Sequence, residues 1–275
     1  VGSTGTIMFL INGFILGMTA GFTVLTAQKF GAGDMKAMRK TVGNAAILAI
    51  IMSLIMTVLG MMAMKPLLGI MKTPDDIFKD AYAYIMVICG GIAAQMLYNF
   101  LSSVLRALGN SKVPLYFLIL AALLNIVLDM VFIIAFHMGA AGAAWATVIS
   151  QGISGILCLL YIAKKVPALY LHREDWKIDK NLAGWQLKIG LPMAFQYSIT
   201  AIGTIVVQSC LNILGSTAAA GFAAASKIEQ VFTQAYVALG TTMATYCAQN
   251  MGAGKVKRIS RGFRATTIMG SIYSV

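Results

Sequence analysis

A short glycine motif occurs twice in the chain and constrains its architecture more than any other feature. Residues 27–33 (AQKFGAG) return as residues 248–254 (AQNMGAG), 221 positions later. Each copy closes a long apolar segment and is followed by basic residues. Glycines suit a tight helix exit because they need little room and allow positive φ. A helix-ending signal repeated at this distance indicates two related halves.

The segments around the two motifs are too apolar for a soluble protein. Hydrophobic residues make up 59% of the chain and charged residues only 11%, whereas soluble domains are about 25% charged. Apolar runs recur along the chain, each long enough to cross a hydrocarbon core roughly 30 Å thick. We therefore predict an all-α, polytopic membrane helix bundle. The predicted helices are 5–28, 42–64, 80–104, 115–136, 142–163, 189–213 and 218–247, with an eighth beginning near 264.

The position of the repeat also predicts the size of the whole protein. Six spans separate the two copies, so a complete protein should have about twelve helices in two pseudo-symmetric six-helix lobes. The even number of spans predicts a pseudo-twofold axis along the membrane normal, with a cavity between the lobes. We expect this chain to be a fragment that holds helices 2–8 and the beginning of helix 9. In this scheme residues 1–165 form the N-lobe, 166–188 a cytoplasmic connection, and 189–275 the start of the C-lobe.

The net charge of +12 follows the predicted topology. Of the 21 Lys and Arg residues, 17 follow the first, third, fifth and seventh predicted helices. The alternate loops hold only Lys65, Lys72 and Lys79, which three aspartates offset. By the positive-inside rule the basic loops are cytoplasmic, in a multi-pass protein of the plasma membrane. This distribution argues against nucleic acid as the partner of the basic residues.

Motifs for catalysis, disulfides or resident metals are not found. The four cysteines lie one per apolar segment, and neither of the two histidines has the spacing of a metal site. The sequence GISG at 152–155 resembles the nucleophile motif of intramembrane proteases, but no later predicted helix carries a histidine base. We expect neither an enzyme nor a cofactor.

Asp129 is the candidate with the strongest physical case for function. Asn125 lies four positions earlier, so both side chains share one helix face. A carboxylate inside the bilayer costs at least a few kcal/mol and should face the protein interior or a wet cavity. Burial would favour a protonated form that carries H⁺, whereas neutral oxygens from Asn125 and from Ser102 or Ser103 would favour an ionised form that binds Na⁺. The alternative is a structural Asp129 that is hydrogen-bonded to Asn125.

Other polar residues are weaker candidates. Lys227 and Glu229 lie about ten residues into their predicted helix, roughly 15 Å deep, and could line the cavity of the second lobe. Gln196 and Asn99 are uncharged candidates for the same substrate cavity. Snorkelling of the charged pair and helix–helix hydrogen bonds of the amides are the alternatives. The glycine motifs should act as architecture and gate hinge rather than touch substrate, through Gln28, Gly31, Gly33, Gln249, Gly252 and Gly254.

Several segments resemble the multidrug and toxin extrusion (MATE) family, in the order in which the family has them. They are the two glycine motifs and residues 105–114, 124–129, 139–147 and 190–192. The resemblance covers essentially the whole chain. It implies a two-lobed antiporter that expels organic cations or other drugs in exchange for H⁺ or Na⁺. We expect small-molecule drugs and the lipid bilayer as partners, and a functional monomer.

The resemblance is closer to the DinF-like branch of that family. There an Asn and an Asp four apart on the fifth helix form the N-lobe cation site, and they map onto Asn125 and Asp129. A polar partner on the fourth helix falls near Ser102. The glutamate that the NorM-like branch carries on its seventh helix has no counterpart in residues 194–200. Met130 stands where the family often has proline, which predicts a softer kink.

These residues predict alternating access, in which a cation at Asp129 switches the affinity of the cavity for drug. Two other functions stay open. A lipid-linked saccharide flippase of related architecture should line its cavity with several basic residues, of which the spans hold only Lys227. A non-transporting receptor or scaffold would not require a titrating Asp129.

Overall fold

The chain folds into a helical bundle without strands over the residues that the structure describes. The computed structural model describes residues 5–70, 75–213 and 216–274. It confirms the predicted all-α class. The helices are α1 (Gly5–Gly31), α2 (Met35–Ile70), α3 (Asp75–Gly90), α4 (Ile92–Ala107), α5 (Lys112–Met130), α6 (Gly139–Lys165), α7 (Lys180–Ile213), α8 (Ser216–Gly252) and α9 (Val256–Ser274), with a π-helical turn at Val131–Ala135 and a 3₁₀ turn at Pro167–Leu169.

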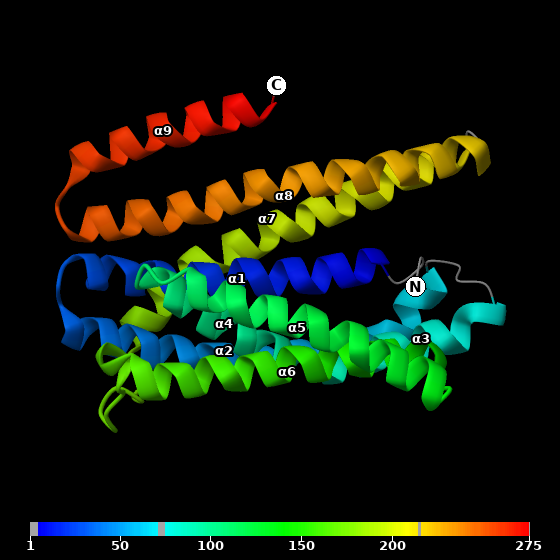
Figure 1. The fold of residues 1–275 in the computed structure, drawn as a ribbon, viewed down its shortest axis with the longest axis horizontal. Coiled ribbons are helices and arrows are strands. Elements are labelled where there is room, and N and C mark those ends of the chain that lie inside the picture. Colours follow the sequence, from blue (N-terminus) through cyan, green and yellow to red (C-terminus); the bar gives the residue numbers. More distant parts are fainter. Residues whose placement is uncertain (1–4, 71–74, 214–215, 275) are drawn as a thin grey trace.

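The first helix lies between two groups of helices. It packs against α2 and α4 on one side and against α7 and α8 on the other. Figure 1 shows α7 and α8 close to α1 at the end of the molecule with the glycine turns, and diverging from it toward the opposite end. The α8 helix in turn packs against α9. The two groups of helices therefore meet mainly at the end where the glycine motifs lie.

Glycines on α1 allow its close approach to α7. A Cβ on Gly17 would lie 2.6 Å from the carbonyl oxygen of Met193, and one on Gly13 would lie 2.8 Å from the Cβ of Tyr197. Small residues four apart let the two backbones come together, which is a common device in membrane bundles. The α1–α7 contact is thus held by backbone proximity along this stripe.

The helices have the length and surface of membrane spans. Within the part of the chain that the structure describes, four segments are long and apolar enough to cross a bilayer, and five if the bent pair α3–α4 is one span. Large apolar side chains point outward, with Met62 on α2 and Ile134 after α5 more than 60% exposed. Outward-facing apolar residues suit contact with lipid. The four segments are Ile7–Gly31, Met35–Gly69, Lys112–Ala135 and Gly139–Lys165.

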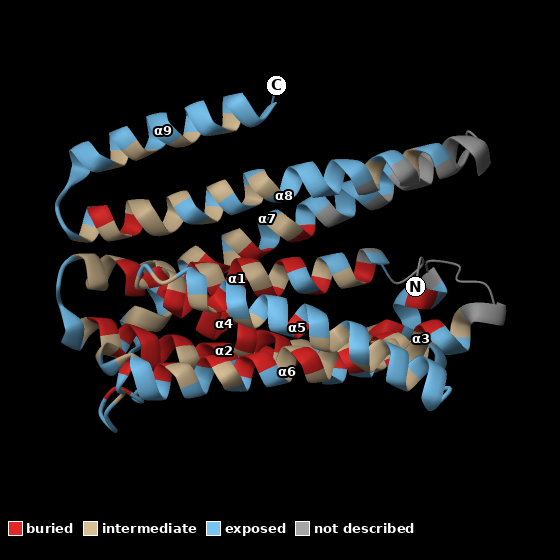
Figure 2. Cartoon of the chain, in the orientation of Figure 1, coloured by how far each residue is buried: buried red, intermediate tan, exposed pale blue. Residues whose placement is uncertain are grey.

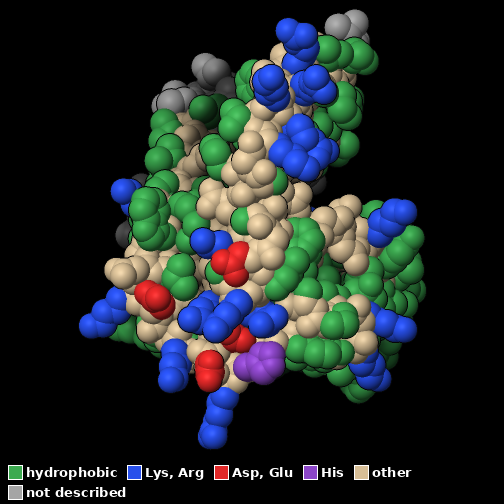
Figure 3. Space-filling view, turned by 90° about the vertical axis from the view of Figure 1, so that its left-hand side faces the viewer, with side chains coloured by type: hydrophobic (Ala, Val, Ile, Leu, Met, Phe, Trp, Pro, Cys, Tyr) green, Lys and Arg blue, Asp and Glu red, His purple; other side chains and the backbone are tan. Residues whose placement is uncertain are grey.

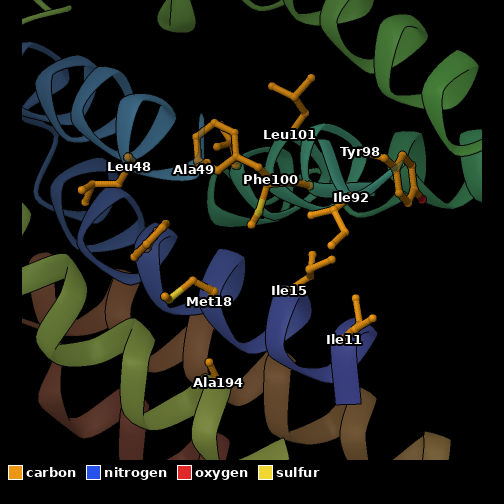
Figure 4. Close-up of a cluster of buried hydrophobic side chains, with 14 of the residues drawn as sticks. Ile11, Ile15, Met18, Leu48, Ala49, Ile92, Tyr98, Phe100, Leu101 and Ala194 are labelled. Atoms are coloured by element: carbon orange, nitrogen blue, oxygen red, sulfur yellow. The ribbon is translucent and has the colours of Figure 1, made fainter. Parts of the chain in front are cut away.

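The buried core lies where α1 meets α2 and α4. Figure 2 shows buried residues concentrated in these helices and exposed residues along α9. Figure 4 shows the apolar side chains of this cluster, which come from α1, α2, α4 and α7. The residues labelled there are Ile11, Ile15, Met18, Leu48, Ala49, Ile92, Tyr98, Phe100, Leu101 and Ala194.

One predicted helix is wrong in shape. The single helix expected over 80–104 is a pair, α3 and α4, bent by 47°. The break falls at Gly90 and Gly91, and a Cβ on Gly91 would collide with the side chain of Val148 on α6. Glycine at this position lets α6 approach the bend, so the bend is fixed by a tertiary contact as well as by the glycine pair.

The seventh helix begins inside the segment predicted as the inter-lobe connection. The Asp179 carboxylate accepts hydrogen bonds from the backbone N–H groups of Asn181 (2.9 Å) and Leu182 (3.2 Å) and so caps α7. The Gln186 side chain is fully buried and accepts a 2.7 Å hydrogen bond from the Asn44 amide of α2. Residues 180–188 are therefore helical and packed against α2.

Candidate cation site and the glycine turns

Asn125 and Asp129 lie one helical turn apart on α5, so their side chains share one face of the helix. The Asn125 amide is 3.4 Å from the Thr147 hydroxyl, to which it donates. Thr147 donates in turn to the Ala143 carbonyl of its own helix at 3.0 Å. The Asp129 Oδ1 atom is buried and has no hydrogen-bond partner among the described residues. Tyr84 of α3 lies near this carboxylate.

A cavity of about 150 Å³ lies beside Asn125, between α5 and α6. Its polar lining comes from Asn125, Thr147, Ser150 and Gln151. The Gln151 side-chain oxygen is buried and, like the Asp129 oxygen, has no hydrogen-bond partner in the described part of the chain. An unpartnered buried oxygen is costly unless it finds a donor or a cation. The site thus has acceptors in excess of donors.

All these side chains offer oxygen atoms as ligands for a cation. One carboxylate with amide and hydroxyl oxygens suits a hard cation such as Na⁺, and the same carboxylate can instead hold a proton. The described residues contain no group of three or more His, Cys, Asp or Glu side chains that could hold a metal ion. The residues at Asp129 therefore fit an alkali cation or H⁺ better than a transition metal.

Thr147 and Gln151 were not identified from the sequence. They lie four positions apart on α6, which is the same spacing as Asn125 and Asp129 on α5. That spacing was a signal for a polar helix face. The sequence alone, however, does not tell which two helices place their polar faces together.

Ser102 lies away from this cavity. It is fully buried on α4 beside Tyr98 and Cys158. The Tyr98 hydroxyl donates to the Pro114 carbonyl at 3.0 Å, near the start of α5. Asn125 is eleven residues further along α5, or roughly 16 Å at 1.5 Å per residue. The structure thus brings Asn125 together with α6 and does not bring it together with Ser102.

The predicted substrate-cavity residues are dispersed. Asn99 is half-buried and donates to the Gln95 carbonyl of its own helix at 2.8 Å. Gln196 on α7 and Glu229 on α8 are exposed. The side chain of Lys227 lies outside the described residues. The three described side chains, Asn99, Gln196 and Glu229, are not in the lining of the cavity beside Asn125.

The two glycine turns lie against each other. A Cβ on Gly31 would collide with the Gln249 carbonyl, and a Cβ on Gly252 would collide with the Gln28 carbonyl. Ala27 and Ala248, the first residues of the two motifs, are buried in one cluster with Ala107. The copies thus make reciprocal contacts at the ends of α1 and α8.

The two turns also have the same backbone hydrogen bonds. The N–H of Asp34 bonds to the Lys29 carbonyl at 3.1 Å, and that of Lys255 bonds to the Asn250 carbonyl at 2.8 Å. Gly33 and Gly254 have φ of +74° and +69°. This six-to-one bond with a left-handed glycine is the Schellman helix ending. The expected positive φ at the helix exit is confirmed in both copies.

Comparison with known proteins places this geometry in a family. The MatE family model matches residues 1–131 and 192–275. The probable multidrug resistance protein YpnP of Bacillus subtilis is 34% identical over 93% of this chain and 57% of its own length. A FAD transporter of Shewanella oneidensis is 25% identical over 93% of this chain and 57% of its own length. The chain thus spans less than two thirds of the length of these relatives.

Solved structures show the same fold. An outward-facing multidrug resistance MATE family transporter of the MOP superfamily superimposes with a TM-score of 0.91 at 20% identity. The match covers 99% of this chain and 61% of that structure. At this identity the likeness establishes the fold alone.

Proposed function

Since the chain belongs to the MatE family, we propose that the full protein is a secondary active multidrug efflux antiporter, which exports organic cations or other drugs in exchange for H⁺ or Na⁺. Members of this family are multi-pass membrane transporters rather than enzymes. The observation that carries the coupling step is the buried Asp129 oxygen without a partner, one turn from Asn125. An intramembrane carboxylate in such a position is typical of an ion pathway.

The geometry supports a specific coupling step at α5. A proton on Asp129, or Na⁺ held by oxygens of Asp129, Asn125 and Thr147, would satisfy the unpartnered acceptor. Loss of the cation leaves that acceptor buried, which favours a different packing of α5 on α6. The π-helical turn begins two residues after Asp129 and interrupts the α-helical pattern there. A change at Asp129 would thus act on a helix that already departs from regular geometry.

The substrate class is a separate part of the proposal. Relatives of this chain include both a multidrug resistance protein and a FAD transporter, so membership alone does not fix the substrate. A drug with an apolar body and a positive charge suits a chain that is rich in methionine, with 18 residues, and carries acids in its spans. Drug export agrees with the similarity to YpnP, a probable multidrug resistance protein, at 34% identity.

Dye export by the full-length parent tests the proposal. The parent and its Asp129→Asn variant are expressed at matched membrane levels, and ethidium efflux is followed under an imposed proton or sodium gradient. Asp80→Asn is the matched control, since Asp80 is exposed on α3. We expect the parent and the control to export dye faster when the gradient is imposed. In Asp129→Asn this gradient-driven increase in efflux should be about 5- to 150-fold smaller, the range that typical coupling energies give.

Two results would contradict the proposal. If the parent exports no dye under either gradient, multidrug export is rejected and lipid-linked saccharide flipping should be assayed next. If Asp129→Asn exports as well as the parent, Asp129 has a structural role. The gradient that drives export by the parent identifies the coupling ion.

A further inference from the structure

A second cavity lies between the two glycine turns and has no part in the proposed coupling step. Its volume is about 200 Å³. One wall comes from the end of α1 and the other from the end of α8 and the turn into α9. We refer to it as the basic cleft, and its lining residues are Phe30, Gly31, Tyr246, Gln249, Asn250, Ala253, Lys255 and Arg258.

The cleft is positively charged and its cations lack acidic partners. Lys255 and Arg258 are both exposed. The ion pairs found among the described residues involve Asp175 and include neither of them. No acidic residue follows Glu229 in the chain, whereas five basic residues lie between 255 and 264. Figure 3 shows Lys and Arg side chains gathered in the upper part of this end of the molecule, without acidic side chains beside them.

Hydrogen bonds and close packing hold the walls of the cleft in place. The Tyr246 hydroxyl donates to the Arg258 carbonyl at 3.1 Å and so fixes the first turn of α9. A Cβ on Gly262 would collide with the Tyr246 ring, so α9 lies directly on this side chain. The Gln249 amide donates to the Ala107 carbonyl of α4 at 2.8 Å. The cations are thus presented by an ordered backbone rather than by a loose tail.

The first copy of the motif shows what the second copy lacks. After its second glycine the first copy has Asp34, whose carboxylate accepts a 2.9 Å hydrogen bond from the Ala37 N–H and caps α2. The equivalent residue of the second copy is Lys255, 221 positions later. Where α2 has its own carboxylate, the start of α9 has a cation beside an open cavity.

We propose that the basic cleft binds a phosphate group, carried by an anionic phospholipid headgroup or by a soluble phosphate compound, through Lys255 and Arg258. Asn250 and Tyr246 line the same cavity and offer polar atoms for additional hydrogen bonds. Basic clusters next to membrane spans attract anionic headgroups, and paired cations with amide groups are typical partners of phosphate. Binding at this cleft does not depend on which substrate the full protein exports.

The position of the cleft gives the ligand a structural consequence. Its walls include Gly31 from one copy of the motif and Gln249 from the other, so the cavity exists only while the ends of α1 and α8 meet. A ligand that binds only this arrangement stabilises it.

Binding to the purified full-length parent tests the proposal. The protein in neutral detergent is titrated with dioleoyl phosphatidylglycerol, with dioleoyl phosphatidylcholine, and separately with inorganic phosphate, and bound ligand is counted by native mass spectrometry. The Lys255→Gln/Arg258→Gln variant removes both cations from the cleft. The matched control, Lys257→Gln/Arg261→Gln, removes the same charge from α9 residues outside the lining.

We expect phosphatidylglycerol to bind in preference to phosphatidylcholine, with the affinity about 30-fold weaker in the cleft variant and nearly unchanged in the control, since each of the two cations contributes about fivefold. Binding of inorganic phosphate with the same variant dependence, but no preference for phosphatidylglycerol, supports the site and identifies a soluble ligand.

Three results overturn the proposal. Equal losses in the cleft variant and the control would mean diffuse surface attraction rather than a site. The proposal is also rejected if neither phosphatidylglycerol nor phosphate binds the parent with any preference. A third variant, Lys255→Asp, gives the second turn the residue that the first turn has at Asp34, and it serves if the double variant misfolds. Undiminished binding by this folded variant contradicts the assignment.

Discussion

Replacing Gly252 with alanine should force the ends of α1 and α8 apart. The added Cβ would lie 2.7 Å from the carbonyl carbon of Gln28 and 3.0 Å from its Cα. Ordinary contacts of this kind begin at 3.4 Å. The helix ends must therefore separate by at least 0.7 Å, which is the difference between 3.4 Å and the 2.7 Å to the carbonyl carbon. The obstructing atoms are backbone on both sides, so no side chain can rotate to relieve the contact.

The magnitude follows from this rigidity. Overpacking costs about 1–3 kcal/mol, and a backbone neighbour places this site in the upper part of that range. Alanine regains up to about 1 kcal/mol over glycine inside a helix, but less at Gly252 because it is the last residue of α8. The net loss in unfolding free energy should be about 2 kcal/mol.

The unfolding free energy of the full-length parent in micelles, measured by denaturant titration, checks this value. Gly184→Ala is the control, since nothing lies within 4 Å of a Cβ there. Alanine at Gly184 should stabilise by about 0.5–1 kcal/mol through helix propensity. If Gly252→Ala is as stable as Gly184→Ala, the two helix ends do not touch.

The reciprocal contact predicts a further, non-additive result. A methyl group on Gly31 would act across the same contact, against Gln249. One separation of the helix ends accommodates both methyl groups, so the double variant Gly31→Ala/Gly252→Ala should cost about 1 kcal/mol or more less than the sum of the single variants. Additive costs would show that the two contacts are independent.

Three other substitutions test the packing and capping of the predicted cytoplasmic end. Gln186→Ala removes a fully buried side chain that bonds to the Asn44 amide (2.7 Å) and to a backbone carbonyl of α2. The unfolding free energy should therefore fall by about 2–5 kcal/mol. If the losses from Gln186→Ala and Asn44→Ala are additive in the double variant, the direct bond between the two side chains is refuted. Asp34→Ala removes the cap of α2 and should lower the unfolding free energy by about 1 kcal/mol in the same titration. Lys255→Asp should raise the unfolding free energy by up to about 1 kcal/mol by capping α9. Unchanged stability in both variants would contradict the capping role.

Apolar runs predicted the membrane part of each helix but not its extent. The α2 helix begins at Met35 rather than at 42, and α7 at Lys180 rather than at 189. Hydropathy reports where a helix would contact lipid, and polar residues continue both helices beyond that zone. For α7 the signal was the capping residue Asp179, which a hydropathy pattern does not weigh.

The turn geometry was predictable from local chemistry, but the contact between the turns was not. Glycine at 33 and 254 predicted a positive φ, and both have it. That Gly31 lies on Gln249 while Gly252 lies on Gln28 depends on how α1 and α8 pack. A repeated motif predicts equivalent positions in two halves, whereas contact between them is a tertiary property.

The cation site was likewise predictable only in part. The spacing of Asn125 and Asp129 predicted one polar face on α5, because that follows from helix geometry. The expected partner Ser102 lies near the start of α5, and the hydroxyl that contacts Asn125 belongs to Thr147 on α6. The helix that faces α5 at the depth of Asn125 is α6, and this pairing is a tertiary property that no local pattern specifies.

The most direct test of the coupling proposal is the affinity of the purified full-length parent for ethidium as a function of cation concentration. Ethidium binding is measured by fluorescence anisotropy across a range of Na⁺ concentrations and of pH, for the parent, Asp129→Asn and Asp80→Asn. We expect Na⁺ or H⁺ to change the apparent Kd for ethidium by about 5- to 150-fold in the parent and in Asp80→Asn, and to leave the Kd of Asp129→Asn unchanged. If Asp129→Asn keeps the full cation dependence, the coupling cation binds elsewhere and the central claim is wrong.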